Sequence, residues 1–212
     1  MKPSKSEGLR EKKKRLTRQH ISDMATKLFF EHGFENVTVA DVALAADVSR
    51  MTVSNYFSRK EELFFDRLDE LCELLEKTLR QREARSPVAA LRELTEELFD
   101  QKHQMTMRHE GVVKFWQVVA ESPSLLNYAL LQFDEISKKL GRMMAKSAGE
   151  EATDPTAHLL ATIIGNTWRI AYTDALQREQ SNPGELNTNV MKDIIIRGFN
   201  AAEAAARDTR YI

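Results

Sequence analysis

The chain has only one cysteine, Cys72, among its 212 residues. A single cysteine forms no disulfide within the chain and cannot by itself build a thiolate metal site, which is typical of proteins in a reducing compartment. Cys72 falls in an apolar pattern with helical spacing. We therefore interpret it as a small core residue, with a redox sensor as the less favoured alternative.

Long apolar runs are also absent. No stretch of the sequence approaches the roughly 20 uninterrupted apolar residues that a membrane-spanning helix needs. Residues 1–18 carry charges throughout, whereas a secretory signal has an apolar core. We therefore expect a soluble, cytoplasmic protein with no membrane partner.

Motifs for catalysis and metal binding are missing as well. The five histidines lack metal-ligand spacing, and neither a glycine-rich phosphate loop nor a recognisable serine or cysteine nucleophile motif occurs. The sequence therefore predicts no catalytic residue, no metal site and no cofactor. It favours a binding protein over an enzyme, and a helical module that binds only other proteins is an alternative.

Charge is distributed unevenly along the chain, although the net charge is only -1. Residues 1–60 carry 12 Lys/Arg and 7 Asp/Glu, a net of +5, while residues 61–212 carry 19 and 25, a net of -6. A basic end on an acidic body is typical of proteins that bind an anionic partner such as DNA at that end. A solvated, disordered basic tail is the alternative reading of the same charges.

Helical periodicity continues from about residue 16 to near the end of the chain, and no convincing alternating strand occurs, so we predict an all-α fold. We expect four C-terminal helical segments, at about 87–121, 123–147, 155–179 and 184–206. Gly111 should divide the first segment and Gly149 should end the second. Each segment starts with an N-cap residue followed by proline: Ser86-Pro87, Ser122-Pro123, Asp154-Pro155 and Asn182-Pro183.

Four shorter helices are expected before Ser86, at about 17–32, 38–46, 49–57 and 58–79. Gly33 stands where a left-handed residue ends the first of them. Thr38 and Ser49 precede the second and third as capping residues, and the segment Ser58-Arg59-Lys60-Glu61 reads as a capping box for the fourth.

The second and third of these helices are separated by a turn of only two or three residues around Asp47-Val48. This is the layout of a helix-turn-helix, whose second helix enters the major groove of DNA. The face of that helix toward DNA must be polar and small. The 49–57 segment offers Arg50, Thr52, Ser54 and Asn55 for that face, while Val53 and Phe57 can turn inward.

The segment from Thr38 to Leu63, TVADVALAADVSRMTVSNYFSRKEEL, resembles the DNA-binding signature of the tetracycline-repressor (TetR) family. The similarity is close over 17–63 and looser over the later helices. Asp47 stands where the family commonly has glycine, and Ser54 stands where an aromatic residue is frequent. Because aspartate tolerates a left-handed conformation better than most residues, the turn should survive.

The resemblance implies a basic flexible arm at 1–16, a helix-turn-helix domain at 17–63, and a helical ligand-binding and dimerisation domain at 64–212. It also implies two sets of DNA contacts. Phosphates should be contacted by Thr38, Ser49, Tyr56 and Lys60, and bases by Arg50, Met51, Thr52 and Asn55. For Tyr56, packing inside the domain is the alternative. Lys60 would lie in the first turn of a helix, against the helix dipole, so a phosphate partner would explain its charge.

Aromatic residues and methionines recur at helical spacing in the later helices, where plain core packing is the first interpretation of any single residue. Together with the polar residues between them they also suit a ligand cavity. The resemblance implies a pocket for an unidentified small-molecule inducer between the fourth helix and the segments 105–121, 123–147 and 155–179. Its predicted walls are Phe115, Trp116, Phe133 and Trp168.

The last two segments, 155–179 and 184–206, carry more apolar surface than one helix pair would bury. Small residues there should let helices approach closely: Gly165, Gly198, Ala202 and Ala205. We predict a homodimer with a four-helix seam that presents two recognition helices to a near-palindromic DNA operator. The predicted function is ligand-responsive repression of transcription. A regulator that acts constitutively, or as an activator without an inducer, is an alternative.

Overall fold

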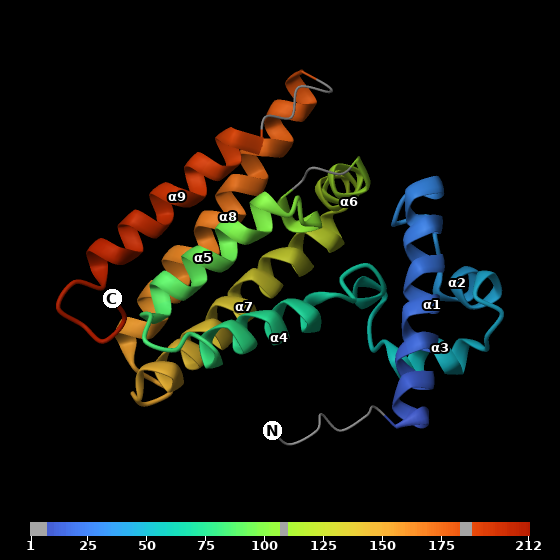
Figure 1. Ribbon diagram of the computed structural model, residues 1–212. Coiled ribbons are helices and arrows are strands. Elements are labelled where there is room, and N and C mark those ends of the chain that lie inside the picture. The colour runs from blue at the N-terminus through green and yellow to red at the C-terminus, as the bar shows by residue number, and fades with distance from the viewer. Residues whose placement is uncertain (1–7, 107–109, 183–187) are drawn as a thin grey trace. The chain divides into compact units, whose positions relative to one another are not determined.

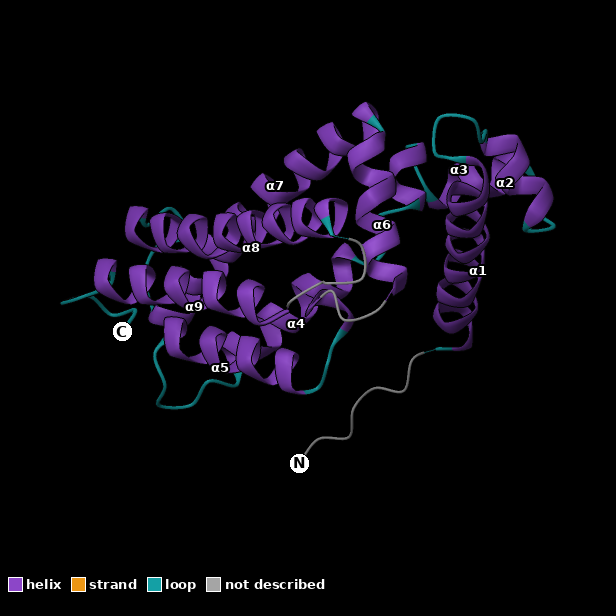
Figure 2. Ribbon diagram, turned by 90° about the horizontal axis from the view of Figure 1, so that it is seen from above, coloured by secondary structure: helices purple, strands orange, loops and turns teal. Residues whose placement is uncertain are grey.

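The computed structural model describes residues 8–106, 110–182 and 188–212. Over this part of the chain every regular element is a helix and none is a strand, which confirms the all-α class (Figures 1 and 2). The chain divides into two compact units, Met1–Leu68 and Asp69–Ile212. No helix in the described ranges combines the length and apolar character needed to cross a membrane.

The first unit is built around α1 (Leu9–His32). This helix buries Ile21, Ala25 and Phe29 on one face, and it ends at Gly33 as predicted. The φ of Gly33 is positive (80°), but its ψ of 150° differs from the left-handed helical conformation that was expected. The helix begins eight residues earlier than expected, inside the segment predicted as an arm over 1–16. The residues that fill 9–16 are leucine, lysine, arginine and glutamate, which favour a helix over a coil. Residues 1–7 of that segment lie outside the described part of the chain.

Two short helices follow, α2 (Val39–Ala45) and α3 (Arg50–Tyr56), and both begin at the predicted caps. At Thr38 a full capping box forms, because its amide donates to the Asp41 carboxylate (2.8 Å) and its hydroxyl accepts from the Asp41 amide (3.3 Å). The Thr38 hydrogen bonds lower the pKa of Asp41. The bond from the Thr38 amide to the Asp41 carboxylate is therefore strongest while Asp41 is ionised, and it weakens as the pH falls through that lowered pKa, whereas the bond from the Asp41 amide does not titrate.

The fourth predicted helix is interrupted. A 3₁₀ turn, η1 (Lys60–Leu63), comes first, and α4 (Leu68–Arg80) starts only after a break. Leu63, Phe64 and Phe65 are all buried. A regular helix spreads three consecutive side chains over about 200°, so burying all three in one core favours a break. The capping box predicted for Ser58 and Glu61 does not form, because the Ser58 amide donates a hydrogen bond to the carboxylate of Glu62 (2.8 Å).

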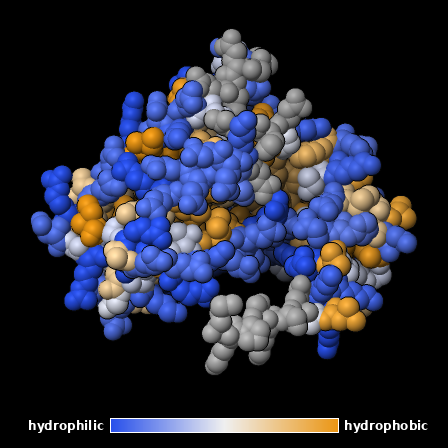
Figure 3. Space-filling model, viewed as in Figure 1, coloured by the Kyte–Doolittle hydropathy of each residue, from blue (hydrophilic) through white to orange (hydrophobic). Residues whose placement is uncertain are grey.

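The second unit contains α4, α5 (Pro87–Asp100), η2 (Gln104–Thr106), α6 (Glu110–Glu121), α7 (Pro123–Ala148), α8 (Pro155–Ser181) and α9 (Thr188–Ala205). In Figures 1 and 2, α9 lies beside both α5 and α8, and α8 lies beside α7. Hydrophilic residues cover most of the face in Figure 3, with apolar residues visible between them in patches.

Cys72 of α4 is half-buried, and this burial raises the pKa of its thiol.

Three of the four proline-marked helix starts are confirmed. The side chains of Ser86, Ser122 and Asp154 each accept a hydrogen bond from the amide three residues later. At the fourth, Asn182 ends α8 instead of capping a new helix, and Pro183 lies outside the described residues. Gly149 ends α7 in the left-handed conformation, as predicted.

The division of segment 87–121 lies elsewhere than predicted. Helix α5 ends after Asp100, Lys102 takes a positive φ of 52°, and the amide of His103 donates to the carbonyl of Leu98 (2.8 Å). This is a Schellman cap in which lysine occupies the position usually taken by glycine. Gly111 instead lies within α6.

Two of the small residues assigned to a dimer seam are used inside one chain. A Cβ added at Gly198 of α9 would lie 2.1 Å from the Thr167 hydroxyl of α8, and one at Gly165 of α8 would lie 2.3 Å from the Ser137 hydroxyl of α7. These glycines therefore allow close contact of α8 with both α7 and α9. Of the two alanines, Ala202 is buried in the same core and Ala205 is exposed.

Candidate nucleic-acid interface

Helix α3 has only seven residues, yet it has two clearly different faces. Val53 and the following Phe57 are 1% and 4% exposed and pack inward, as predicted. Four of the predicted outward residues are exposed to solvent: Arg50, Met51, Ser54 and Asn55. Thr52 is half-buried, and its hydroxyl lies 2.8 Å from the Ser49 hydroxyl that caps the helix.

The turn between α2 and α3 is a Schellman cap closed by Asp47. Its φ is 53°, its amide donates to the carbonyl of Leu44 (3.2 Å), and the amide of Val48 donates to the carbonyl of Ala43 (2.9 Å). The prediction that aspartate would adopt the left-handed conformation is confirmed. The departure from glycine at this position therefore leaves the geometry of the turn intact.

Asp47→Gly is expected to stabilise the first unit by about 0.5 to 1 kcal/mol, because glycine adopts a positive φ without the steric cost that other residues incur. Asp47→Val is expected to destabilise it by more than about 1 kcal/mol, because a β-branched residue resists this conformation. Urea unfolding followed by circular dichroism measures both effects. Equal midpoints for the glycine and valine variants would contradict the assignment of strain to this residue.

Lys60 has partners inside the protein that the sequence did not reveal. It begins η1 rather than an α-helix, its Nζ donates to the carbonyl of Phe34 (2.5 Å), and it lies 4.1 Å from the Phe34 ring centroid and 5.7 Å from that of Phe29. Burial lowers the pKa of Lys60. A phosphate is therefore not needed to explain this charge, since the carbonyl and the two rings already stabilise it.

Tyr56 is half-buried at the end of α3, and its carbonyl accepts a hydrogen bond from Nη1 of Arg18 (2.6 Å). Arg18 was not among the predicted site residues. A signal was present in the sequence, because Arg18 precedes Ile21 and Ala25 on the buried stripe of α1. A charged residue that continues an apolar stripe indicates a specific polar partner.

The four residues predicted to line a ligand pocket are brought into one aromatic cluster. Tyr172 of α8, which was not predicted, joins them through ring centroids 4.8 Å from Trp116, 5.9 Å from Trp168 and 6.5 Å from Phe133, and Phe115 contacts Trp116 edge to face at 5.4 Å. The Tyr172 hydroxyl donates to the carbonyl of Met105 (2.8 Å). In this arrangement the rings pack against each other.

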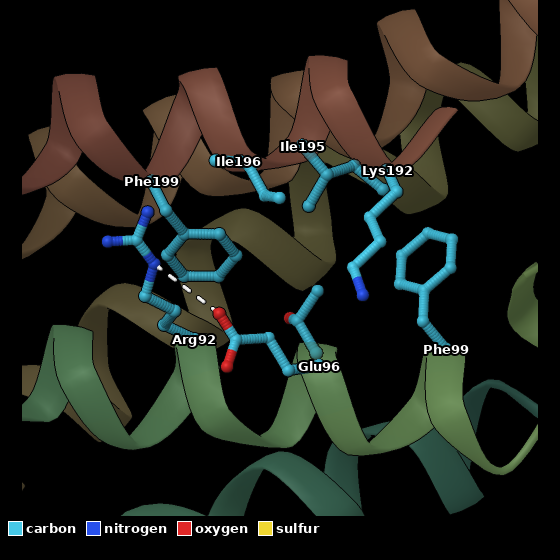
Figure 4. Close-up of a pocket in the computed structure, with 8 residues that line it drawn as sticks. Arg92, Glu96, Phe99, Lys192, Ile195, Ile196 and Phe199 are labelled. Carbon is cyan, nitrogen blue, oxygen red and sulfur yellow. Dashed lines mark ion pairs between the residues drawn. The ribbon is translucent and has the colours of Figure 1, made fainter. Parts of the chain in front are cut away.

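A small hollow lies elsewhere, between α5 and α9 (Figure 4). It is shallow and partly open to solvent, and the surface that lines it is mostly apolar. Arg92 at its edge forms an ion pair with Glu203 (2.7 Å) and lies 3.9 Å from Glu96. None of the four predicted wall residues lines this hollow, whose lining is Arg92, Thr95, Glu96, Phe99, Lys192, Ile195, Ile196 and Phe199.

The described residues contain no group of three histidine, cysteine, aspartate or glutamate side chains placed to hold a metal ion.

Residues 21–66, which include α2 and α3, match the family described as bacterial regulatory proteins, tetR family.

Two curated proteins are similar over most of the chain. MftR of Mycobacterium tuberculosis, named as a candidate regulator of mycofactocin biosynthesis, is 30% identical over 154 residues, covering 70% of this chain and 75% of that protein. The HTH-type transcriptional regulator TcmR of Streptomyces glaucescens is 28% identical over 153 residues, covering 69% and 67%. Among solved structures, native NalD of Pseudomonas aeruginosa, the secondary repressor of the MexAB-OprM multidrug efflux pump, has the same fold with a TM-score of 0.55. It is 18% identical, and the match covers 87% of this chain and 97% of that one.

Proposed function

Because this chain belongs to the TetR family of bacterial transcriptional regulators, we propose that it is a ligand-responsive repressor that binds a palindromic operator as a homodimer. The observation that carries the proposal is α3, a short capped helix that buries Val53 and Phe57 and presents polar side chains to solvent. A major groove about 12 Å wide admits one such helix.

The proposed DNA contacts lie on α3 and at the residues just before α2, just before α3 and at the start of η1. Residues of α3 that reach base edges are Arg50, Met51, Thr52 and Asn55, of which Thr52 is the most buried. Residues proposed for the phosphates are Thr38, Ser49, Tyr56 and Lys60. Lys60 would have to contact a phosphate in addition to its Phe34 carbonyl partner, so we expect it to contribute less than an exposed lysine would.

We place the inducer at the aromatic cluster of the second unit, with Phe115, Trp116, Phe133 and Trp168 as its walls. The cluster joins α6, α7 and α8 and carries the polar Tyr172 hydroxyl at one edge. Ring-rich, mostly apolar sites with a few polar groups suit small organic ligands. A ligand that separates these rings would favour a different arrangement of the helices, and induction needs only that the two arrangements differ in ligand affinity.

The proposed dimer seam is the outer face of α8, together with α9. Leu159 and Ile170 are 53% and 51% exposed in the single chain, and half-buried Ile163 lies between them on the same face. Spacings of four and seven residues place these three side chains along one stripe of the helix. An apolar stripe at this spacing is typical of a helix that packs against a partner helix.

Selection of bound duplexes from a random DNA library tests the proposal. A near-palindromic sequence bound as two protomers per duplex is the expected result. Binding of the selected duplex should then weaken in the presence of an inducer, found by screening aromatic compounds and cell extract. Failure to prefer any selected duplex over a scrambled one would overturn DNA recognition. A preference that no compound or extract alters would indicate a constitutive binder.

Arg50→Ala is expected to weaken binding to the selected operator and to change the preferred base at one position in each half-site. A good bidentate contact between arginine and guanine contributes about 1 to 3 kcal/mol of discrimination. The measurement is fluorescence anisotropy with the operator and its single-base variants. Lys27→Ala, which removes an exposed charge from α1, is the matched control, and the same base preference in both variants would argue against the assignment.

A further inference from the structure

The end of α3 depends on a residue from another helix. The last turn of α3 contains no basic residue. The carbonyls in the last turn of a helix lack partners within the helix and carry a partial negative charge. Arg18 of α1 supplies both a donor and a positive charge there, because its Nη1 donates to the carbonyl of Tyr56 at 2.6 Å. Its guanidinium also lies 4.2 Å from the centroid of the Phe57 ring, which is buried directly after α3.

A second side chain of α1 reaches the end of α2. His20 Nε2 lies 3.2 Å from the carbonyl of Ala46, the residue that ends this helix. Because a carbonyl oxygen only accepts, Nε2 carries the proton in this contact. Helix α1 therefore contacts the C-terminal carbonyls of both short helices through residues 18 and 20.

Helices of seven residues are not stable on their own, so tertiary contacts must hold α2 and α3 in place. Packing of Val53 and Phe57 fixes which face of α3 turns inward. Apolar packing is not directional, however, so it constrains the tilt of a short helix less than a hydrogen bond does. The contact between Arg18 and Tyr56 is directional and lies at the far end of α3 from the Ser49 cap.

We propose that Arg18 is a positioning residue for α3: it fixes the orientation of this helix through the Tyr56 carbonyl and the Phe57 ring, without touching DNA. His20 contributes in the same way at the end of α2. The proposal rests on the proposed function, because an orientation of α3 matters only if this helix reads a DNA groove. The negative charge of the Asp66 carboxylate also interacts electrostatically with Arg18.

The test compares Arg18→Gln, Arg18→Lys and the control Lys27→Ala in the full-length protein. Hydrogen exchange detected by mass spectrometry reports the order of residues 50–57, and anisotropy titrations at several salt concentrations report affinity for the selected operator. Arg18→Gln should speed exchange in α3 and weaken operator binding about tenfold, because a charge-assisted hydrogen bond is lost. The dependence of log affinity on log salt concentration should keep its slope. Arg18→Lys, which keeps a charged donor, should restore most of the affinity.

Three results would overturn the proposal. A salt slope flatter by about one unit in Arg18→Gln would show that Arg18 contacts a phosphate directly. A lower unfolding temperature with unchanged affinity would show that the contact only stabilises the fold. Unchanged exchange in α3 would show that Arg18 does not order this helix. If the wild-type protein prefers no duplex while Arg18→Gln still loosens α3, the proposed function fails and the structural role of Arg18 stands alone.

Discussion

Ile170→Asp is expected to convert the protein into a monomer and to weaken its binding to a palindromic operator by at least about a hundredfold. Ile170 lies on the outer stripe of α8 with Leu159 and Ile163, and it is 51% exposed in the single chain. A carboxylate there would be buried without a partner in a dimer but would be solvated in a monomer. Linking two half-site contacts in one dimer raises affinity by about 10² to 10⁴, which is what the monomer loses.

Sedimentation equilibrium measures the change in mass, and anisotropy with a full operator and with a single half-site measures the change in affinity. The control is Leu131→Asp on α7, which places the same charge on a leucine that is 59% exposed but lies away from the stripe. Binding to the half-site should be similar in the wild type and both variants, because the first unit is unchanged. If Ile170→Asp sediments as a dimer, the seam does not include this part of α8.

The parts of the fold that the sequence predicts well are those decided by neighbouring residues. Thr38 and Ser49 form the predicted caps because a side-chain oxygen needs to reach an amide only two or three residues away. The same holds for the proline-marked starts of α5, α7 and α8. The positive φ of Asp47 is also a local matter of one turn.

The parts that the sequence does not predict are decided by contacts between distant residues. The break between η1 and α4 follows from the need to bury Phe64 and Phe65 with Leu63, which no capping pattern reveals. Lys60 and Arg18 find carbonyl partners 26 and 38 residues away. A charged residue signals that a partner exists, but the folded chain decides whether that partner is a phosphate, a carbonyl or a ring.

The same limit applies to the aromatic cluster. Helical spacing predicts that Phe115, Trp116, Phe133 and Trp168 face the interior, and all four are at least half-buried. Spacing along one helix does not say which rings from different helices meet. Tyr172 therefore enters as the ring that contacts Trp116, Phe133 and Trp168 only once the helices are packed together.

Phe29→Ala is expected to unfold the first unit at physiological temperature and so to abolish operator binding, while the second unit stays folded and dimeric. Phe29 has no exposed surface, and its ring centroid lies 4.9 Å from that of Phe34 and 5.5 Å from that of Phe64. Lys60 also lies over this ring. Replacing a fully buried phenylalanine by alanine costs about 3 to 5 kcal/mol. A unit as small as Met1–Leu68 has little stability to spare beyond that amount.

Differential scanning calorimetry of the wild type and the variant should show loss of one transition and retention of another, because the second unit has a core of its own. Phe30→Ala is the control: Phe30 is only half-buried and contacts Phe64 edge to face at 5.9 Å, so its loss should cost less than about half as much. Sedimentation should give a dimer for both variants. Equal destabilisation by the two changes, or loss of the dimer in Phe29→Ala, would mean that the two units do not unfold independently.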